Sequence, residues 1–230
     1  MKPIRLRDFV RDTNGWYYAV AAYDNTFTIG SVLRYIPDPA GDRTDGTGTR
    51  YRKVEFEEAY RLIAEHHPDW AGLVHRIPHD KITAVLKPDE AIEQIASTHP
   101  KVAQLVKALH LPPCTFGVTG SLLCGLGGEN SDIDGVVYGP AFRHAQKKLV
   151  RAIQMGSVEE LSEDLWKTVY RKRNPDTSYE EFILHEKRKL NRGQVDGTYF
   201  DLLYTRGYQD LPGFTMEKGS ILGKRVIEAM

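Results

Sequence analysis

The stretch that decides the fold runs from Gly117 to Gly139 and has the sequence GVTGSLLCGLGGENSDIDGVVYG. A β-prone run at residues 115–118 predicts a strand. Gly120 and Ser121 then predict a turn, and the apolar residues 122–126 predict the first turns of a helix, whose unpaired N–H groups favour an anion. Because glycine has no Cβ, the backbone can approach a phosphate closely, and the serine hydroxyl can donate to a phosphate oxygen.

Two aspartates, Asp132 and Asp134, lie one residue apart at the head of a second β-prone run. Alternate residues of a strand share a face and lie about 6.6 Å apart along it, so both carboxylates would point the same way while Ile133 turns into the core. Such carboxylates repel each other unless a cation lies between them, and Mg²⁺ is the natural cation for oxygen ligands that also meet phosphates. The alternatives are an ordinary glycine loop and a solvated strand end, but the combination favours a functional site.

This spacing resembles a known signature. Gly120-Ser121, a spacer of ten residues and Asp132-x-Asp134 resemble the signature of the DNA polymerase beta nucleotidyltransferase superfamily. The local form TGSLL…SDID is similar to the uncharacterised archaeal nucleotidyltransferases often labelled polymerase-beta-region proteins, and the similarity continues into the N-terminal part through LRYIPD. The resemblance implies an α/β (α+β) fold: a mixed sheet flanked by helices, with adjacent motif strands and a further acidic residue on a third strand.

The best candidate for the third acidic residue is Asp201, in the apolar and aromatic run GTYFDLLYT that follows the turn signal Asp196-Gly197. A carboxylate in a buried strand is costly unless it is paired or bound to a metal, although a hydrogen-bonded strand end is the alternative. By the resemblance, Asp132 and Asp134 hold two Mg²⁺ ions, and Asp201 completes the metal site and helps to activate the attacking hydroxyl. The metals would stabilise the attacking and leaving oxygens of an in-line displacement at the α-phosphate of a nucleoside triphosphate (NTP).

The length and composition of the chain limit its domain organisation, its surface charge and its location. A chain of 230 residues that is 41% hydrophobic can bury a core for one catalytic domain and a smaller one. Lys plus Arg equals Asp plus Glu at 31 each, so any basic surface must be local. Cys114 and Cys124 lack the spacing of a zinc site and are typical of reduced packing residues in an intracellular protein. Without a signal segment or an apolar run of about 18 residues, we expect a cytoplasmic protein with no membrane partner.

Three segments are expected. Residues 1–88 should form a small α+β domain, residues 89–215 the nucleotidyltransferase domain, and residues 216–230 a C-terminal strand. The N-terminal domain has no catalytic signature, so we expect a substrate-contacting or structural role. Its predicted elements are strands at 16–23, 30–36 and 51–54, a mobile loop at 37–49 and an amphipathic helix at 55–65. His66 and His67 favour a surface turn over a metal site.

Several helices are predicted in the catalytic domain. One should extend from an N-cap at Asp89 through Leu109, and others should span 141–155, 161–173 and 178–192, the last beginning with a capping box at Ser178-Tyr-Glu-Glu181. Between residues 143 and 192 there are twelve Lys or Arg and eight Asp or Glu, a net charge of +4. These basic helices could contact a triphosphate or a nucleic-acid backbone, or could present a solvated face. The candidates for nucleotide binding, beside Gly120 and Ser121, are Arg188 and Arg192.

We therefore expect Mg²⁺-dependent transfer of a nucleoside monophosphate from an NTP to an acceptor, with release of pyrophosphate. The acceptor stays open between a nucleic acid end, a protein and a small molecule. The alternative function is a non-catalytic nucleotide- or nucleic-acid-binding module with the same fold. Residues 223–230 predict a strand at the end of the chain, and the similar archaeal proteins often continue into a further β-rich domain. A naturally short form and a truncated chain both remain open.

Overall fold

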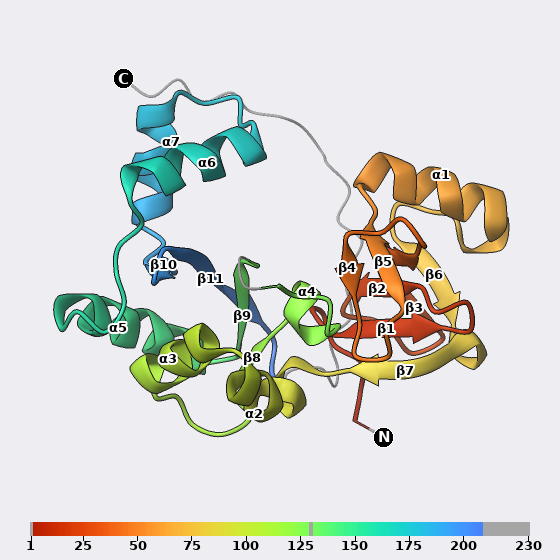
Figure 1. Cartoon of the computed structure of the whole chain (residues 1–230), viewed down its shortest axis with the longest axis horizontal. Coiled ribbons are helices and arrows are strands. Elements are labelled where there is room, and N and C mark those ends of the chain that lie inside the picture. Colours follow the sequence, from red (N-terminus) through yellow and green to blue (C-terminus); the bar gives the residue numbers. More distant parts are fainter. Residues whose placement is uncertain (1, 129–130, 209–230) are drawn as a thin grey trace, which may run out of the picture.

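The computed structural model of the chain describes residues 2–128 and 131–208. It confirms a mixed α+β fold built on two sheets (Figure 1). One sheet belongs to the N-terminal part of the chain, and a smaller sheet with most of the helices belongs to the remainder. The strand expected at 223–230, like the whole segment 216–230, lies outside the described residues.

The N-terminal sheet is antiparallel and has the strand order β4-β5-β3-β2-β1-β7, with β6 also paired to β3. Helix α1 packs on it through Ala59 and Ile63, so that one core cluster lies wholly within this part of the chain. Three of the four side chains of β1 and of β2 are buried, because one face of these strands packs in the α1 core cluster and the other in the cluster shared with the second sheet. The elements are β1 (Phe9–Asp12), β2 (Tyr17–Val20), β3 (Thr28–Pro37), β4 (Arg43–Thr44), β5 (Arg50–Lys53), α1 (Phe56–His66), η1 (Pro68–Trp70), β6 (His75–Pro78), η2 (His79–Lys81) and β7 (Ile82–Leu86).

The second sheet has the order β10-β11-β9-β8 and is mixed, because β9 and β11 run parallel while the two outer pairs are antiparallel. The motif strands are adjacent, as predicted, and the strand of Asp201 lies beside that of Asp134. Val137 and Leu202 on one face of this sheet share a core with Leu105 and Leu149 of the flanking helices. The elements are α2 (Pro88–Thr98), α3 (Pro100–Leu109), β8 (Phe116–Val118), α4 (Gly120–Leu123), β9 (Ile133–Tyr138), α5 (Ala141–Gln154), β10 (Arg192–Val195) and β11 (Thr198–Thr205).

Helices α6 (Glu163–Arg173) and α7 (Tyr179–Lys187) form a hairpin that stands away from the sheet on the side opposite α5 (Figure 1). A small cluster that includes Trp166, Val169 and Phe182 holds the two helices together. The start of α7 is fixed by the predicted capping box, in which Ser178 and Glu181 bond each other's backbone N–H groups.

Two helix predictions are wrong. The helix expected from Asp89 to Leu109 breaks at His99, because Pro100 cannot donate an N–H and instead begins α3. The helix expected over 178–192 ends at Lys187, so Arg188 and Arg192 do not lie one turn apart on a helix. Asp89 is not a cap either, since its side chain is buried against Arg5 at 2.6 Å.

The two parts of the chain share one interface. Phe9 and Tyr35 of the N-terminal sheet belong to the same core cluster as Leu122 of α4. The Thr119 hydroxyl donates to the carbonyl oxygen of Arg7 at 2.7 Å. The N-terminal sheet is therefore packed directly beside the motif. In the part of the chain that the structure describes, no helix has the length and apolar character needed to cross a membrane.

Candidate active site

The parallel pair β9 and β11 brings the predicted acidic residues together. Asp134 and Asp201 are partners in the register of the two strands, and Asp132 lies directly before β9. Because side chains alternate along a strand, Asp134 and Asp201 point away from the face that packs on the helices. This face of the sheet is turned toward the N-terminal part of the chain.

The glycine turn lies against the same carboxylates. Gly120 has a φ of +71°, and a Cβ placed there would lie 2.5 Å from Oδ2 of Asp134. Any other residue would therefore collide with the carboxylate as well as strain the backbone. The backbone N–H of Thr119 donates to the carbonyl oxygen of Asp134 at 2.9 Å, which fixes the turn to the strand. Helix α4 is only one turn long, shorter than the sequence indicated.

The pKa values of these carboxylates are raised although cations lie nearby, among them Arg173 beside Asp201 and Lys172 near Asp134. Burial raises the pKa of Asp134 to about 7, and the negative charges of Asp201 and Asp132 add to the increase. Burial also raises the pKa of Asp201, whose side chain is only 8% exposed. Oδ2 of Asp201 accepts a hydrogen bond from the Tyr199 hydroxyl at 3.2 Å, and Nη2 of Arg173 lies 3.9 Å away. Within the described residues, Oδ1 of Asp201 is buried without a hydrogen-bond partner.

The residues present fit a divalent cation. Carboxylate oxygens are the ligands that Mg²⁺ prefers, and Oδ1 of Asp201 has no other partner among the described residues. A cation would also relieve the repulsion that raises the pKa of Asp134. Among residues 2–128 and 131–208, no three His, Cys, Asp or Glu side chains already form a group that could hold a metal ion. The two-ion arrangement therefore stays a prediction.

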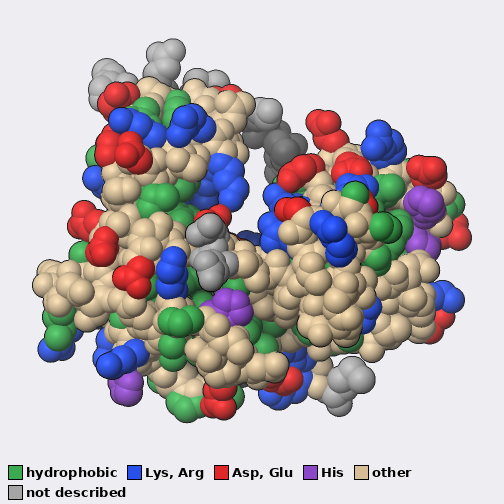
Figure 2. Space-filling view, viewed as in Figure 1, with side chains coloured by type: hydrophobic (Ala, Val, Ile, Leu, Met, Phe, Trp, Pro, Cys, Tyr) green, Lys and Arg blue, Asp and Glu red, His purple; other side chains and the backbone are tan. Residues whose placement is uncertain are grey.

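A charged cleft of about 810 Å³ opens beside the carboxylates. Its lining includes Ser121, Asp132 and Asp134, which makes it the place where the motif residues meet solvent. The space-filling view shows the molecule hollowed between the α6–α7 hairpin and the N-terminal sheet, with Lys and Arg side chains on both sides of the hollow (Figure 2). The cations that line the cleft are Arg34, Arg43 and Lys53 of the N-terminal sheet and Lys172 of α6.

The cations of the N-terminal sheet were not predicted as site residues. Arg43 donates through Nη1 to the carbonyl oxygen of Leu126, at the end of the motif loop, over 3.1 Å. Arg34 lies over the Phe56 ring at 4.8 Å, and its Nη1 atom has no hydrogen-bond partner in the described chain. Arg34 lies within the stretch LRYIPD, but the resemblance gave that stretch no role, and both arginines reach the site through long-range packing.

Lys172 contacts one of the predicted metal ligands. Its Nζ atom lies 3.1 Å from Oδ2 of Asp132, and both side chains are substantially exposed. Lys172 belongs to the basic segment 143–192, so sequence analysis indicated a role for the segment without selecting this residue. In the structure, the ammonium group partly neutralises Asp132 at the edge of the cleft.

The two arginines predicted to bind the nucleotide do not line the cleft. Arg192 begins β10, and its largely buried guanidinium forms an ion pair with Glu186. It lies opposite Asp201 in the register of β10 and β11. Arg188 is exposed directly after α7. The structure thus places Arg192 behind the third carboxylate and Arg188 away from it.

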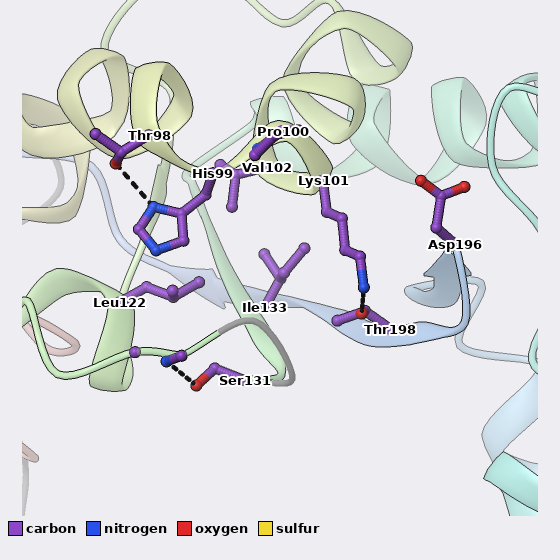
Figure 3. A pocket seen from close by; sticks show the side chains of 12 residues that line it. Thr98, His99, Pro100, Lys101, Val102, Leu122, Ser131, Ile133, Asp196 and Thr198 are labelled. Carbon is purple, nitrogen blue, oxygen red and sulfur yellow. Dashed lines mark hydrogen bonds between the residues drawn. The ribbon is translucent and has the colours of Figure 1, made fainter. Parts of the chain in front are cut away.

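A separate cavity of about 540 Å³ lies on the other side of the motif loop (Figure 3). Ile133 and Leu122 point into it, whereas the three aspartates do not line it. Four of its polar residues are paired with each other: Lys101 donates to the Thr198 hydroxyl at 2.6 Å, and His99 shares a hydrogen bond with Thr98 at 2.9 Å. This cavity therefore belongs to the packing behind the strands and not to the carboxylate cluster.

Comparison with known proteins gives one informative relative. The chain is 34% identical over 239 aligned positions to the protein named "Uncharacterized protein MJ1086" from Methanocaldococcus jannaschii. The match covers 90% of this chain and 70% of that protein, so it spans both sheets. No protein-family model and no solved structure matches the chain.

Proposed function

The chain belongs to the family of the uncharacterized protein MJ1086 of Methanocaldococcus jannaschii, whose name states no activity, and we propose a function from the site itself. The protein is a Mg²⁺-dependent nucleotidyltransferase of the polymerase-beta type, which transfers a nucleoside monophosphate from an NTP to an acceptor hydroxyl. The observation that carries this proposal is the pairing of Asp134 with Asp201 on parallel strands, directly against the turn at Gly120.

The charged cleft suits the triphosphate. Ser121 and four cations line it, and phosphate oxygens bind hydroxyl and guanidinium donors well. Arg34 and Arg43 are not paired with any carboxylate of the described chain within 4.0 Å, so their charges are available to an anion. We expect the β- and γ-phosphates to lie between the N-terminal sheet and Lys172.

The transfer step moves the nucleoside monophosphate from the NTP to the acceptor oxygen. The acceptor hydroxyl oxygen attacks the α-phosphorus and forms the new O–P bond, while the bond from that phosphorus to the bridging oxygen of the β-phosphate breaks. Pyrophosphate leaves with the electron pair, and the hydroxyl proton passes to the carboxylate of Asp201. The raised pKa of Asp201 makes it a stronger proton acceptor than an ordinary aspartate. Mg²⁺ held by Asp132 and Asp134 would supply charge stabilisation for the phosphate oxygens.

Calorimetric titration tests the proposal. Each NTP is titrated with Mg²⁺ into the wild type, into the double variant Asp132→Asn, Asp134→Asn, and into Asp196→Asn as a control. Asp196 is an exposed aspartate in the β10–β11 turn that does not line the charged cleft. We expect the double variant to bind at least about tenfold more weakly, since both anionic ligands of the metal are removed, and the control to bind like the wild type.

Equal binding by the double variant and the wild type would contradict the proposal. Metal-dependent binding by the wild type would be followed by assay of pyrophosphate release with candidate acceptors, beginning with RNA ends and small hydroxyl compounds. Binding that persists in Asp201→Asn, with no release by the wild type at any acceptor, would favour the non-catalytic binding module instead.

A further inference from the structure

A second cavity meets the charged cleft at Asp134. It measures about 440 Å³ and lies between the N-terminal sheet and the strand pair β9–β11. Arg34, Tyr35 and Asp134 line both this cavity and the charged cleft, so the two spaces adjoin at the carboxylate cluster. Gly120, the residue in contact with the Asp134 carboxylate, also lines the cavity.

The two spaces differ in chemistry. Lys53, Arg43 and Lys172 line only the charged cleft. The second cavity has mainly apolar walls, formed by residues that include Leu6, Phe9, Val20, Val32, Phe56 and Leu203. We call it the apolar cavity. A triphosphate that entered it would meet only the two arginines Arg7 and Arg34, whereas four cations line the charged cleft, so we place the nucleotide phosphates in the charged cleft.

The cations of the apolar cavity gather at one end. Arg34 is shared with the charged cleft, and the charge of Arg7 acts on both Asp134 and Asp201. These arginines therefore lie near the carboxylates, and the remainder of the cavity is left to apolar side chains. A ligand held there needs one polar end and an apolar body.

The geometry of β11 places the apolar cavity beside the carboxylate cluster. Leu203 follows Asp201 by two residues on β11, so the two side chains lie on the same face of the strand. Leu203 lines the apolar cavity and Asp134 closes it. A hydroxyl group held in the cavity beside Asp134 would therefore lie next to the strand partner of Asp134, which is Asp201, although Asp201 itself does not line the cavity.

We propose that the apolar cavity binds the acceptor, and that the acceptor is a small molecule with an apolar body and a hydroxyl group. This inference rests on the proposed transferase function and names the substrate class that it left open. The acceptor oxygen forms the bond to the α-phosphorus, pyrophosphate leaves, and the proton passes to Asp201, as in the step above. The cavity volume lies within the range of about 300–1,000 Å³ typical of small-molecule sites.

A nucleic acid end fits this cavity poorly. Every nucleotide of a strand brings a phosphate, and the apolar walls offer no partner to a series of phosphates. The charged cleft, at about 810 Å³, is large enough to accommodate a whole nucleotide, which leaves the apolar cavity for the second substrate.

Ligand-observed NMR with 1-naphthol as the probe tests the proposal on the full chain. Naphthol combines an aromatic body with one hydroxyl, and it carries no phosphate. We expect it to bind the wild type and to bind at least about tenfold more weakly to Ala19→Phe, because a larger side chain on β2 fills the cavity. Val32→Phe, on β3, is a second variant should the first fail to fold.

The matched control is Ala84→Phe, the same substitution at a half-buried position on β7 of the same sheet, away from both cavities. It should bind naphthol like the wild type. Mg²⁺ and NTP should bind wild type and Ala19→Phe within about twofold of each other, since the nucleotide occupies the other space. Arg43→Gln should show the reverse pattern, with weaker NTP binding and unchanged naphthol binding.

Four results would overturn the inference. If naphthol does not bind the wild type while NTP does, the acceptor site is wrong and the transferase proposal stands. Displacement of naphthol by NTP would assign the cavity to the nucleobase, and displacement by a short oligoribonucleotide would assign it to a nucleic acid end. Naphthol binding without any NTP binding by the wild type would overturn the transferase function and with it the acceptor role.

Discussion

Two carboxylate pairs of the described chain, Asp8 with Asp89 and Asp134 with Asp201, differ in the residues that lie closest to them. In the first, where the N-terminal segment meets α2, Asp8 lies 2.8 Å from Nζ of Lys87 and Asp89 lies 2.6 Å from Nη2 of Arg5. In the second, Asp134 has another carboxylate, Asp201, as its partner on the adjacent strand.

The neighbouring charges act in opposite directions on the pKa values of Asp8 and Asp134. Burial raises the pKa of Asp8, but the nearby Lys87 and Arg5 act to lower it. Burial also raises the pKa of Asp134, and there the charges of Asp201 and Asp132 raise it further. The carboxylates of the first cluster have cations at ion-pair distance, whereas among the described residues no cation lies within 4.0 Å of Asp134, and Lys172 and Arg7 lower its pKa only in part. We expect this difference to separate a structural cluster from one that binds a cation.

The largest predicted effect comes from removing a cation from the first cluster, that of Asp8 and Asp89. Arg5→Met leaves Asp89 buried without its cation and removes the guanidinium from between the rings of Tyr138 and Tyr208, which lie 3.8 Å and 3.7 Å from it. We expect the free energy of unfolding to fall by about 3–5 kcal/mol in urea denaturation, as for other broken buried ion pairs. Lys2→Met, which removes an exposed ion pair with Glu90, is the control and should change little.

A loss in Arg5→Met no larger than that in Lys2→Met would contradict this prediction. It would mean that the buried pair contributes no more than an exposed one. The cluster of Asp8 and Asp89 could then not be described as a stabilising one.

An intermediate effect is predicted at the unpaired cluster. In metal-free wild type, the pKa of Asp134 is raised to about 7 from the ordinary 3.8, so the folded state binds a proton that the unfolded state has lost. This contribution to stability is complete below pH 3.8 and is lost as the pH rises toward 7. We expect the wild type to lose on the order of 2 kcal/mol of stability between pH 5 and pH 7, and Asp134→Asn, which cannot ionise, to show no such loss.

Urea denaturation in EDTA at pH 5 and pH 7 measures this difference. Asp196→Asn, in an exposed turn, should follow the wild type at both values. Addition of Mg²⁺ should raise the stability of the wild type at pH 7 and leave Asp134→Asn unchanged, since a cation replaces the missing counter-charge. Parallel behaviour of wild type and Asp134→Asn would show that Asp134 is not held in the repulsive state described above.

The smallest effect concerns a buried ionisable group with no charged neighbour that shifts it. His75 on β6 is fully buried, and both ring nitrogens lack a hydrogen-bond partner in the described chain. Burial alone lowers its pKa, so the unfolded state gains a proton first and stability falls as the pH drops below about 6.5. The loss should reach up to about 1.4 kcal/mol at pH 5.5.

His75→Phe should remove this acid-side loss, because phenylalanine has no proton to gain and retains the ring contact with Tyr60. The measurement is the difference in unfolding free energy between pH 7.5 and pH 5.5 in both proteins. The exposed His185 of α7 serves as the control position through His185→Phe, which should keep the pH difference of the wild type. An identical pH difference in wild type and His75→Phe would show that His75 is protonated in the folded state.

The parts of the fold that were predicted from sequence depend on local signals. The strands that carry Asp134 and Asp201 were predicted because β-prone runs and turn residues mark both of them. Their adjacency was implied by the family resemblance, and the structure confirms it. The capping box at Ser178 was likewise predicted from four consecutive residues. The break at Pro100 was missed although the proline was visible, because the apolar periodicity continued through it.

The remainder of the site was not predictable in this way. Arg34 and Arg43 lie about 90 residues before Asp132 and reach the cleft only because the N-terminal sheet packs on the motif face. Arg192 was predicted on a helix because its basic neighbours are helical, whereas pairing with β11 makes it part of a strand. A sequence pattern identifies a carboxylate cluster more readily than the long-range packing that surrounds it.

The ring contacts of Arg5 also limit the order in which parts of the chain can pack during synthesis. One of the two rings that enclose its guanidinium belongs to Tyr208, at the end of the described chain. A ribosome that adds about 5–20 residues per second needs about 10–40 s to make the intervening stretch. The N-terminal sheet has all its strands once Leu86 has been made, but one side of the Arg5 guanidinium stays uncovered until Tyr208 has been made. The contact between the two sheets is therefore complete only after the second sheet has been synthesised.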